Sequence, residues 1–492
     1  MSKKPHRLLI ALALSSSMLV HAAPIPGKTR NEAATARHLA SLISGSEAKL
    51  AELTLFFTQM PKGGDLHHHY SGALYAEQYL RWVEQAGYCI DKTSYRVLTA
   101  DKAIAAGREG TPASRTCMTG NEVLLNDGVM AELLQRWSSK DFANHSGIQS
   151  PPDRQFFDTF GYFSAPSNLN FNEGLLTLKR RAIAENLSYI ETMFKMTEPR
   201  LDAEFDSRIQ QTEPNDAAFT ESLRSQLARL EQDPTFKQSV QDYIAKVEAS
   251  SAHVDDAQFT MRYQTYVLRL LAPSQVFSSM VGGFKAASQS PLIVGINIVG
   301  QESNTVAMRD YRLHMKMFQF LKAHYPTVKI ALHAGELALG MVPPEGLKFH
   351  IDEAVNVAGA ARIGHGMDIA HETRAPALLR SLRERDIAVE VNLTSNDFIL
   401  GIKEQAHPVT LYRKYGVPFV LATDDAGVSR NNLSNEYVLF ATRYKPHYAE
   451  VKKLSYNGLR YAFLPPAEKV RLIRQLDERF TQFEALMATI KR

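Results

Sequence analysis

Four short segments of this sequence carry histidines and acids at spacings that could bind a metal ion and move protons. They are Asp65-Leu66-His67-His68-His69, His333-Ala334-Gly335-Glu336, Gly364-His365-Gly366 and Thr423-Asp424-Asp425. Imidazole nitrogens and carboxylate oxygens are common zinc ligands, and the same groups are the usual proton carriers in catalysis. These residue types together point to metal-assisted chemistry at one site.

The histidines at positions 67 and 69 are the starting point of that site. Residues two apart on a β-strand point to the same side, so His67 and His69 can share one metal while His68 points away. A third histidine and a carboxylate would complete a mononuclear zinc site with room for water, and we assign these roles to His333 and Asp424. A single strand-end histidine is more often structural, so the prediction depends on the four segments together.

The elements that must position these segments alternate between short apolar runs and helical segments. We expect helices over 305–324, 345–359, 373–385 and 407–415. The expected strands are Gly64–His68, Gln155–Phe163, Leu187–Met193, Leu292–Val299, Lys329–Leu332, Ala361–Gly364, Ile387–Leu393 and Pro418–Ala422. Eight strand–helix units predict an α/β fold, a (β/α)8 TIM-like barrel whose strand ends converge on one face. A doubly wound sheet is the alternative, but it gives no reason for eight units.

Three further regions surround the predicted barrel, which we place at 60–492. Residues 23–59 predict an N-terminal helical extension, because apolar residues recur near a 3.6-residue period over 29–58. After the first strand we expect a small insertion at about 87–149, rich in Gly, Thr, Asn and Ser. It contains both cysteines, Cys89 and Cys117, for which we predict a disulfide over two unpaired thiols.

Residues 1–22 have the composition of a secretory signal peptide. Basic residues at positions 3, 4 and 7 precede an apolar run over 8–20, and small residues follow at the expected cleavage position. A permanent membrane anchor is the alternative, but the run is shorter than the roughly 20 apolar residues that span a bilayer. We therefore expect an exported protein, periplasmic or secreted, without a stable membrane anchor.

Charge and cysteine usage exclude two classes of function. The 492 residues carry a net charge of +4 and no basic block, which argues against a nucleic-acid partner. The zinc deaminases that edit nucleic-acid bases use a closely spaced cysteine pair, which two distant cysteines cannot supply.

The chemistry-bearing segments resemble the adenosine deaminase family of metal-dependent amidohydrolases. The resemblance rests on MPKGGDLHHH at 60–69, HAGE at 333–336, RIGHG at 362–366 and TDD at 423–425, with GINIVGQE at 295–302 and NLTSN at 392–396 in support. Together they span about residues 61–430, three quarters of the chain. The signal peptide, the helical lead-in and the cysteine-bearing insertion further resemble the secreted, growth-factor-type branch.

This resemblance implies a role for each residue. It implies one zinc ion per chain, bound by His67, His69, His333 and Asp424. Such a metal would lower the pKa of a bound water toward ~7 and supply a hydroxide that attacks the purine carbon bearing the amino group. Glu336 would donate a proton to a ring nitrogen, and His365 would position and deprotonate the water. Asp425 matches a contact to purine N7, and Gly300 a backbone contact to the ring edge.

One position departs from the family pattern. Intracellular members usually have an aspartate two residues after the second histidine, in contact with the ribose 5′-hydroxyl. Here that position is Ser71, followed by the matching Gly72. Serine can hydrogen-bond a hydroxyl, but without charge and with a shorter reach. The resemblance therefore predicts the ring chemistry and leaves the sugar preference open.

We therefore predict zinc-dependent hydrolytic deamination of adenosine or 2′-deoxyadenosine to inosine or 2′-deoxyinosine plus ammonia. Adenine, adenylate or an N6-modified adenine nucleoside are alternative substrates. A non-catalytic extracellular binding or signalling protein on the same scaffold is a second alternative, although it predicts erosion of a catalytic set that is complete here. A dinuclear-zinc hydrolase would need a bridging lysine or glutamate on the fourth strand, where none stands out. For the assembled protein we expect a homodimer.

Overall fold

The computed structural model describes residues 26–111, 113–144, 150–214 and 216–490, and its centre is a sheet of eight parallel strands. The strands are β1 (Lys62–His69), β5 (Leu187–Met193), β6 (Thr260–Leu268), β7 (Ile293–Val299), β8 (Lys329–Ala334), β9 (Arg362–His365), β10 (Ala388–Val391) and β11 (Phe419–Leu421). They neighbour one another in sequence order. The carboxyl ends of all eight strands therefore lie at the same end of the barrel.

The sheet closes between its first strand and the segment just after its last. The His69 N–H donates to the Asp424 carbonyl at 3.1 Å, and the Asp424 N–H donates to the His67 carbonyl at 2.9 Å. These two bonds pair β1 with the end of β11. The predicted (β/α)8 architecture is confirmed as a nearly closed barrel.

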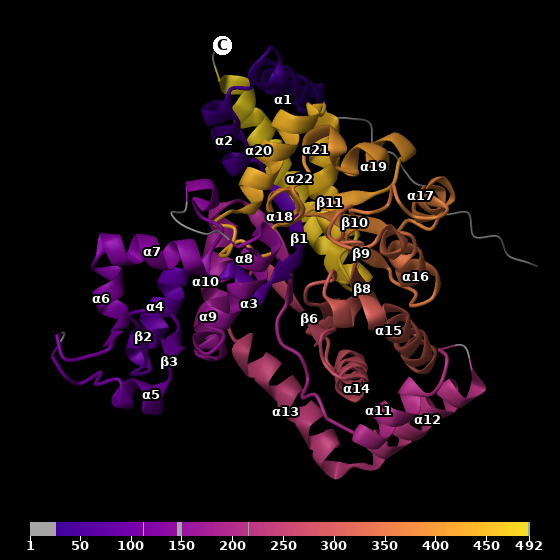
Figure 1. The fold of residues 1–492 in the computed structure, drawn as a ribbon. Coiled ribbons are helices and arrows are strands. Elements are labelled where there is room, and N and C mark those ends of the chain that lie inside the picture. The colour runs from indigo at the N-terminus through magenta and orange to yellow at the C-terminus, as the bar shows by residue number, and fades with distance from the viewer. Residues whose placement is uncertain (1–25, 112, 145–149, 215, 491–492) are drawn as a thin grey trace, which may run out of the picture.

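Helices cover the outside of this barrel (Figure 1). Those that follow or flank the strands are α10 (Phe171–Ala184), α14 (Pro273–Gln289), α15 (Thr305–His324), α16 (His350–Asn356), α17 (Ala375–Glu384), α19 (Val409–Tyr415), α20 (Leu433–Tyr444) and α21 (Tyr448–Arg460). Asn304 caps α15 by accepting the Val306 N–H at 2.9 Å, which starts the helix where the sequence predicts it. Apolar side chains between helices and strands form one large core.

Further helices lie between β5 and β6 and near the ends of other strands. Between β5 and β6 lie α11 (Ala203–Gln210), α12 (Ala217–Gln232) and α13 (Pro234–Ser250). The short α3 (Tyr70–Ala73) follows β1, and α18 (Leu393–Leu400) follows β10. The 3₁₀ turn Pro344–Leu347 precedes α16, so the helix predicted over 345–359 is shorter and begins later.

The N-terminal helical segment packs on the C-terminal helices of the same chain. It consists of α1 (Pro26–Ile43) and α2 (Leu50–Gln59), separated near Gly45, which has a φ of +97°. In Figure 1, α1 lies beside α22 (Pro466–Thr489) and α2 lies beside α20, at the top of the view. The sequence predicted one continuous helical stretch, and a glycine in a conformation that other residues avoid divides it.

The insertion after β1 has its own small antiparallel sheet. Its strands are β2 (Cys89–Asp91), β3 (Val97–Leu98) and β4 (Cys117–Met118), and its helices are α4 (Ala76–Gln85), α5 (Ala100–Ala105), α6 (Gly120–Leu124) and α7 (Asp127–Trp137). Cys89 and Cys117 form a disulfide between β2 and β4. The predicted disulfide is confirmed, and in Figure 1 the insertion projects from the side of the barrel.

Two sequence predictions about strands were wrong. Residues Gln155–Phe163 form helices α8 (Pro152–Asp158) and α9 (Phe160–Phe163), not a strand. Their aromatic residues favour strands, but Pro152 at the first helical turn starts a helix instead. Strand β6 was missed because its interior-facing residues include polar ones such as Gln264, which hide the apolar pattern of a buried strand.

The predicted signal peptide, residues 1–22, lies outside the described residues, so export stays a prediction. Within the described part of the chain, each helix is too short or too polar to cross a membrane.

Candidate active site

Side chains from β1, β8 and the end of β11 meet at the mouth of the barrel. The Asp424 Oδ1 atom lies 3.3 Å from His67 Nε2 and 3.1 Å from His69 Nε2. The His69 and His333 Nε2 atoms are 3.2 Å apart. His68 points away and bonds Thr192 through Nδ1 at 2.9 Å. The structure therefore brings together the four residues that the sequence predicts as metal ligands.

The spacing of these atoms fits a single metal ion. Tetrahedral ligands held about 2.0–2.1 Å from one zinc ion lie about 3.3 Å from each other, close to the separations seen here. His67, His333, His365 and Asp424 also form a group whose ligand atoms all lie within 4.8 Å of one another. The buried His67 Nε2 atom has no hydrogen-bond partner. A cation would satisfy this atom, and the donor set suits zinc.

Asp424 is held in a strained conformation that aims one oxygen at the histidines. Its φ is +58°, a region that non-glycine residues rarely adopt. Ser395 Oγ donates to the Oδ2 atom at 2.6 Å, which leaves Oδ1 facing His67 and His69. The closing bonds with β1 hold the backbone in place. Strain that the surrounding structure enforces is typical of functional sites.

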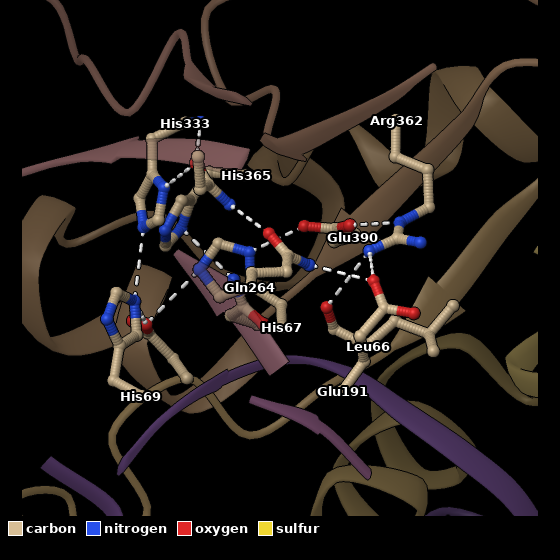
Figure 2. Close-up of polar contacts among 12 residues, drawn as sticks. Leu66, His67, His69, Glu191, Gln264, His333, Arg362, His365 and Glu390 are labelled. Carbon is tan, nitrogen blue, oxygen red and sulfur yellow. Dashed lines mark hydrogen bonds and ion pairs between the residues drawn. The ribbon is translucent and has the colours of Figure 1, made fainter. Parts of the chain in front are cut away.

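Buried acceptors orient the two innermost histidines (Figure 2). His67 Nδ1 donates to Glu390 Oε2 at 2.7 Å, and His333 Nδ1 lies 2.9 Å from Asn297 Oδ1. Both rings then carry their proton on Nδ1 and present the Nε2 lone pair to the metal position. A carboxylate or carbonyl behind a histidine ligand is the usual way to fix its tautomer.

The two acceptors are joined through the barrel interior by a chain of hydrogen bonds, also visible in Figure 2. Arg362 donates to Glu390 at 2.6 Å and to Glu191 at 2.5 Å. Gln264 donates to Glu191 at 2.9 Å and accepts from Asn297 at 3.1 Å. We call the seven residues the interior ring: His67, Glu390, Arg362, Glu191, Gln264, Asn297 and His333. It links one candidate metal ligand to another without an exposed member.

Although burial lowers the pKa of His67, the nearby carboxylates of Asp424 and Glu390 raise it overall to about 10. The electrostatic field at His67 therefore favours a positive charge. A bound metal ion would supply this charge in place of a second proton on the imidazole ring.

Hydrogen bonding also determines the tautomer of His365. The Val409 N–H donates to His407 Nδ1 at 3.0 Å, so His407 carries its proton on Nε2 and donates to Asn396 Oδ1 at 3.1 Å. The Asn396 amide then donates to His365 Nδ1 at 2.9 Å. A neutral His365 therefore carries its proton on Nε2, and this atom lies 3.5 Å from Glu336 Oε1.

The backbone around Glu336 is fixed by a buried glutamate. Glu302 accepts the Gly335 N–H at 3.0 Å and the Glu336 N–H at 2.9 Å. Burial raises the pKa of Glu302, but Arg269 and a hydrogen bond from His350 lower it overall to about 2. A permanently ionised Glu302 thus holds the segment that carries Glu336.

Glu336 and Asp425 are both buried acids that favour the protonated form. Burial and the negative charge of Asp424 raise the pKa of each well above its usual value. Asp425 Oδ1 has no hydrogen-bond partner. A Cβ atom at Gly72 would lie 1.5 Å from that oxygen, so the glycine is needed for this close approach.

A cavity of about 470 Å³ opens directly onto these groups. It is lined by the predicted site residues His69, Ser71, Gly300, His333, Glu336, His365, Asp424 and Asp425, and by two further polar residues, Asp158 and Gln301. Gly300 adopts a φ of +101°, which a larger side chain would resist. The apolar lining comes from Phe156, Phe157, Phe160, Met193, Met196, Tyr266, Leu268, Leu270 and Val299. The size and mixed lining suit a small molecule with a planar ring.

A family model described as adenosine deaminase matches residues 228–479, half of the chain. The chain belongs to the adenosine deaminase family. The matched span contains Gly300, Glu336, His365 and Asp425 but not β1. The position of the β1 histidines beside these residues is therefore seen in the structure and not in the family match.

Individual members of the adenosine deaminase family match over shorter segments. An adenosine deaminase from Enterococcus faecalis is 32% identical over 189 residues, which cover 38% of this chain and 51% of that relative. The chain spans about half the length, or less, of this relative and of similar ones from Serratia proteamaculans and Aliivibrio fischeri.

Two solved structures share the fold of this family member. An N6-methyl-AMP deaminase from Arabidopsis thaliana has a TM-score of 0.53 at 17% identity, covering 86% of this chain and 98% of that one. An amidohydrolase from Burkholderia ambifaria with bound Zn has a TM-score of 0.51 at 16% identity, covering 89% and 95%. At these identities the likeness establishes the fold.

Sequence reasoning about this deaminase family member missed the residues that support the site. Glu390, Arg362, Glu191 and Gln264 lie inside strands, where they look like interruptions of an apolar pattern. One feature of the sequence could have indicated these residues. A charged side chain within a buried strand is energetically costly unless it has a partner, so such residues are expected to pair. The sequence did not indicate that aromatic residues of α8 and α9 line the cavity, because it predicts a strand over this segment.

Proposed function

We propose that this protein is a zinc-dependent aminohydrolase that converts adenosine or 2′-deoxyadenosine to the 6-oxo nucleoside and ammonia. One observation carries the proposal: four metal-ligand side chains, a protonated carboxyl and a hydrogen-bonding histidine share one end of a purine-sized cavity. Family membership supports the same reaction.

The metal would be held by His67, His69, His333 and Asp424. When bound there, zinc lowers the pKa of a coordinated water to about 7 and so supplies an oxygen nucleophile at neutral pH. The zinc-bound amidohydrolase of the same fold supports the choice of metal.

The other residues bind the purine and move protons. Glu336, protonated because of its raised pKa, donates to a ring nitrogen and thereby activates the adjacent carbon for attack. His365 holds the attacking oxygen through its Nε2 proton. In this tautomer the ring positions the water without taking a proton from it, which differs from the deprotonating role that the family resemblance implies. Asp425, also protonated, donates to the acceptor N7, and the Gly300 backbone contacts the ring edge. The water oxygen becomes the 6-oxo group. One water proton leaves with the amino group as ammonia, and the other replaces the proton that Glu336 gave to the ring nitrogen.

The experiment is an assay of the full chain after zinc loading. Ammonia release and the ultraviolet change on conversion of adenosine to inosine should both follow enzyme addition, with about one zinc per chain by metal analysis. A protein that holds no stoichiometric metal and releases no ammonia from adenosine, 2′-deoxyadenosine or adenine would be a binding protein on this scaffold, and the proposal would fail.

We also propose that the chain is exported and resembles the secreted branch of the family. The Cys89–Cys117 disulfide supports this location, because such bonds persist in oxidising compartments. Fractionation of cells that express the full chain tests it: recovery of the protein only in the cytosol, with Cys89 and Cys117 reduced, would contradict export.

A further inference from the structure

A second cavity of about 680 Å³ adjoins the active-site cavity. Five residues line both, which makes them the shared wall: Ser71, Phe160, Met196, Tyr266 and Leu268. Ser71 lies two residues after His69, whereas the other four belong to the apolar wall of the first cavity, so the second cavity joins the first along this wall. A ligand that fills the active-site cavity can therefore extend past Ser71 into the second.

Two lysines supply positive charge in this second cavity. Lys195 follows β5, and Lys246 lies on α13. Lys195 Nζ donates to neutral acceptors, Asn168 Oδ1 at 2.9 Å and the Ser167 carbonyl at 3.4 Å. Both ammonium groups lie near the Phe171 ring, at 5.0 and 5.6 Å from its centroid. Both lysines line the same cavity, and within the described residues neither forms an ion pair with a carboxylate.

Two acids also line this cavity, and in the described part of the chain neither forms an ion pair with Lys195 or Lys246. Glu198 lies 3.5 Å from Arg200, and Asp242 accepts a hydrogen bond from Gln238 at 2.8 Å. Burial and the charge of Lys246 lower the pKa of Lys195 to about 8. An anion between the two ammonium groups would remove that repulsion.

Ser71, which lies where the two cavities join, carries no charge that would repel an anion. Ser71 is a neutral hydroxyl, so a phosphate can pass it without repulsion, and its O–H can donate to a phosphate oxygen. Ser164, Ser167, Asn168 and Ser239 add polar side chains to the lining. Ser167, Asn168 and Ser239 already donate to backbone carbonyls, so the two lysines are the principal donors to an anion.

We propose that the site prefers a purine nucleoside whose sugar carries a phosphate to the free nucleoside, and that Lys195 and Lys246 bind this phosphate in the second cavity. This inference rests on the proposed deamination. With C6 of the purine at the metal end, the sugar points away from the metal. The exocyclic 5′ carbon is the arm of the sugar that can extend furthest, so the preferred substrate is a nucleoside 5′-monophosphate.

The first test compares substrates and variants of the zinc-loaded full chain. We expect kcat/KM for adenosine 5′-monophosphate to exceed that for adenosine and for adenosine 3′-monophosphate. Lys195→Gln and Lys246→Gln should each lower the ratio of nucleotide to nucleoside kcat/KM by roughly tenfold, the usual effect of losing one charge-assisted hydrogen bond. Lys237→Gln, on an exposed residue of the same helix as Lys246, should leave the ratio unchanged.

A substitution of Ser71, where the two cavities join, also tests whether a phosphate binds in the second cavity. Ser71→Asp places a negative charge beside the phosphate path and should lower the nucleotide-to-nucleoside ratio by roughly tenfold or more. A ratio near one in the unchanged protein that does not respond to the lysine variants or to Ser71→Asp would overturn the inference while leaving deamination in place.

Equilibrium binding separates this inference from the proposed reaction. Inosine 5′-monophosphate should bind more tightly than inosine to the metal-free chain, and the Lys195→Gln/Lys246→Gln double variant should remove the difference. Inorganic phosphate alone should compete weakly for the same site. Equal affinity for the nucleotide and the nucleoside would overturn the inference, whether or not the protein deaminates any substrate.

Discussion

The two ends of the active-site cavity are built in different ways. At the inner end, the metal-ligand side chains lie at strand ends and are anchored by the buried interior ring, whose charged members Arg362, Glu191 and Glu390 are paired with each other. At the outer end, the wall consists of apolar side chains from α8, α9, the ends of β5, β6 and β7, and the loops after β5 and β6. Two of these, Phe157 and Phe160, are only partly buried.

This difference teaches how chemistry and substrate choice are divided in the molecule. Inner residues act through directed bonds in a low-dielectric interior, where loss of one partner leaves another unpaired. Outer residues act through contact area, so each contributes a small, replaceable amount. Substitutions at the inner end should therefore have much larger effects than substitutions at the outer wall.

The largest effect is expected for Glu336→Gln. The amide keeps the shape of the side chain but cannot deliver a carboxyl proton, so kcat for deamination should fall by about 10³-fold. Metal analysis should show unchanged zinc content, since Glu336 is not among the proposed ligands. Glu345→Gln, on an exposed residue of the same connection, is the matched control. Activity above a tenth of the original would remove Glu336 from the proposed role.

The next effect concerns stability. Arg362→Met leaves the carboxylates of Glu390 and Glu191 buried without their shared partner, which should lower the free energy of unfolding by about 3–5 kcal/mol. Chemical denaturation monitored by circular dichroism measures it. Arg460→Met breaks an exposed pair with Asp386 and should cost at most about 1 kcal/mol. Equal losses in the two variants would show that the interior ring has no special contribution.

A smaller effect is expected for metal affinity. In Glu390→Gln the side chain still accepts from His67 Nδ1, but without a negative charge, and zinc affinity should fall by about 10–100-fold. Competition with a chelator of known affinity measures the change. Glu384→Gln, on an exposed residue at the end of α17, serves as the control. If the two variants bind zinc equally well, the anchoring of His67 does not tune the metal.

The smallest effect belongs to the outer wall. Phe157→Ala removes part of the apolar lining and should raise KM roughly fivefold, which corresponds to about 1 kcal/mol of lost contact, with little change in kcat. Leu125→Ala, at a residue 87% exposed on the insertion, should leave both constants unchanged. A loss of kcat as large as that of Glu336→Gln would erase the distinction between the two ends of the cavity.

The sequence by itself determined the residues that we propose carry the chemistry, and most of the barrel. Short motifs such as HAGE and TDD are readable because local spacing sets which side chains share a strand end, and the β-branched runs before them mark the strands. Strand β5 and helix α15 were predicted with the bounds that the structure shows. Seven of the eight predicted strands correspond to barrel strands for the same reason.

Only the tertiary structure decided how those residues are held and what surrounds them. Strand β6 was hidden because Gln264 turns inward to a partner 73 residues away, and no local pattern reports such pairing. The tautomer of His365 depends on His407 and Val409, which lie on a different segment. The lysine-lined cavity beside Ser71 depends on β5 and α13 lying together. Long-range contacts of this kind arise from packing, so they become visible only in the folded chain.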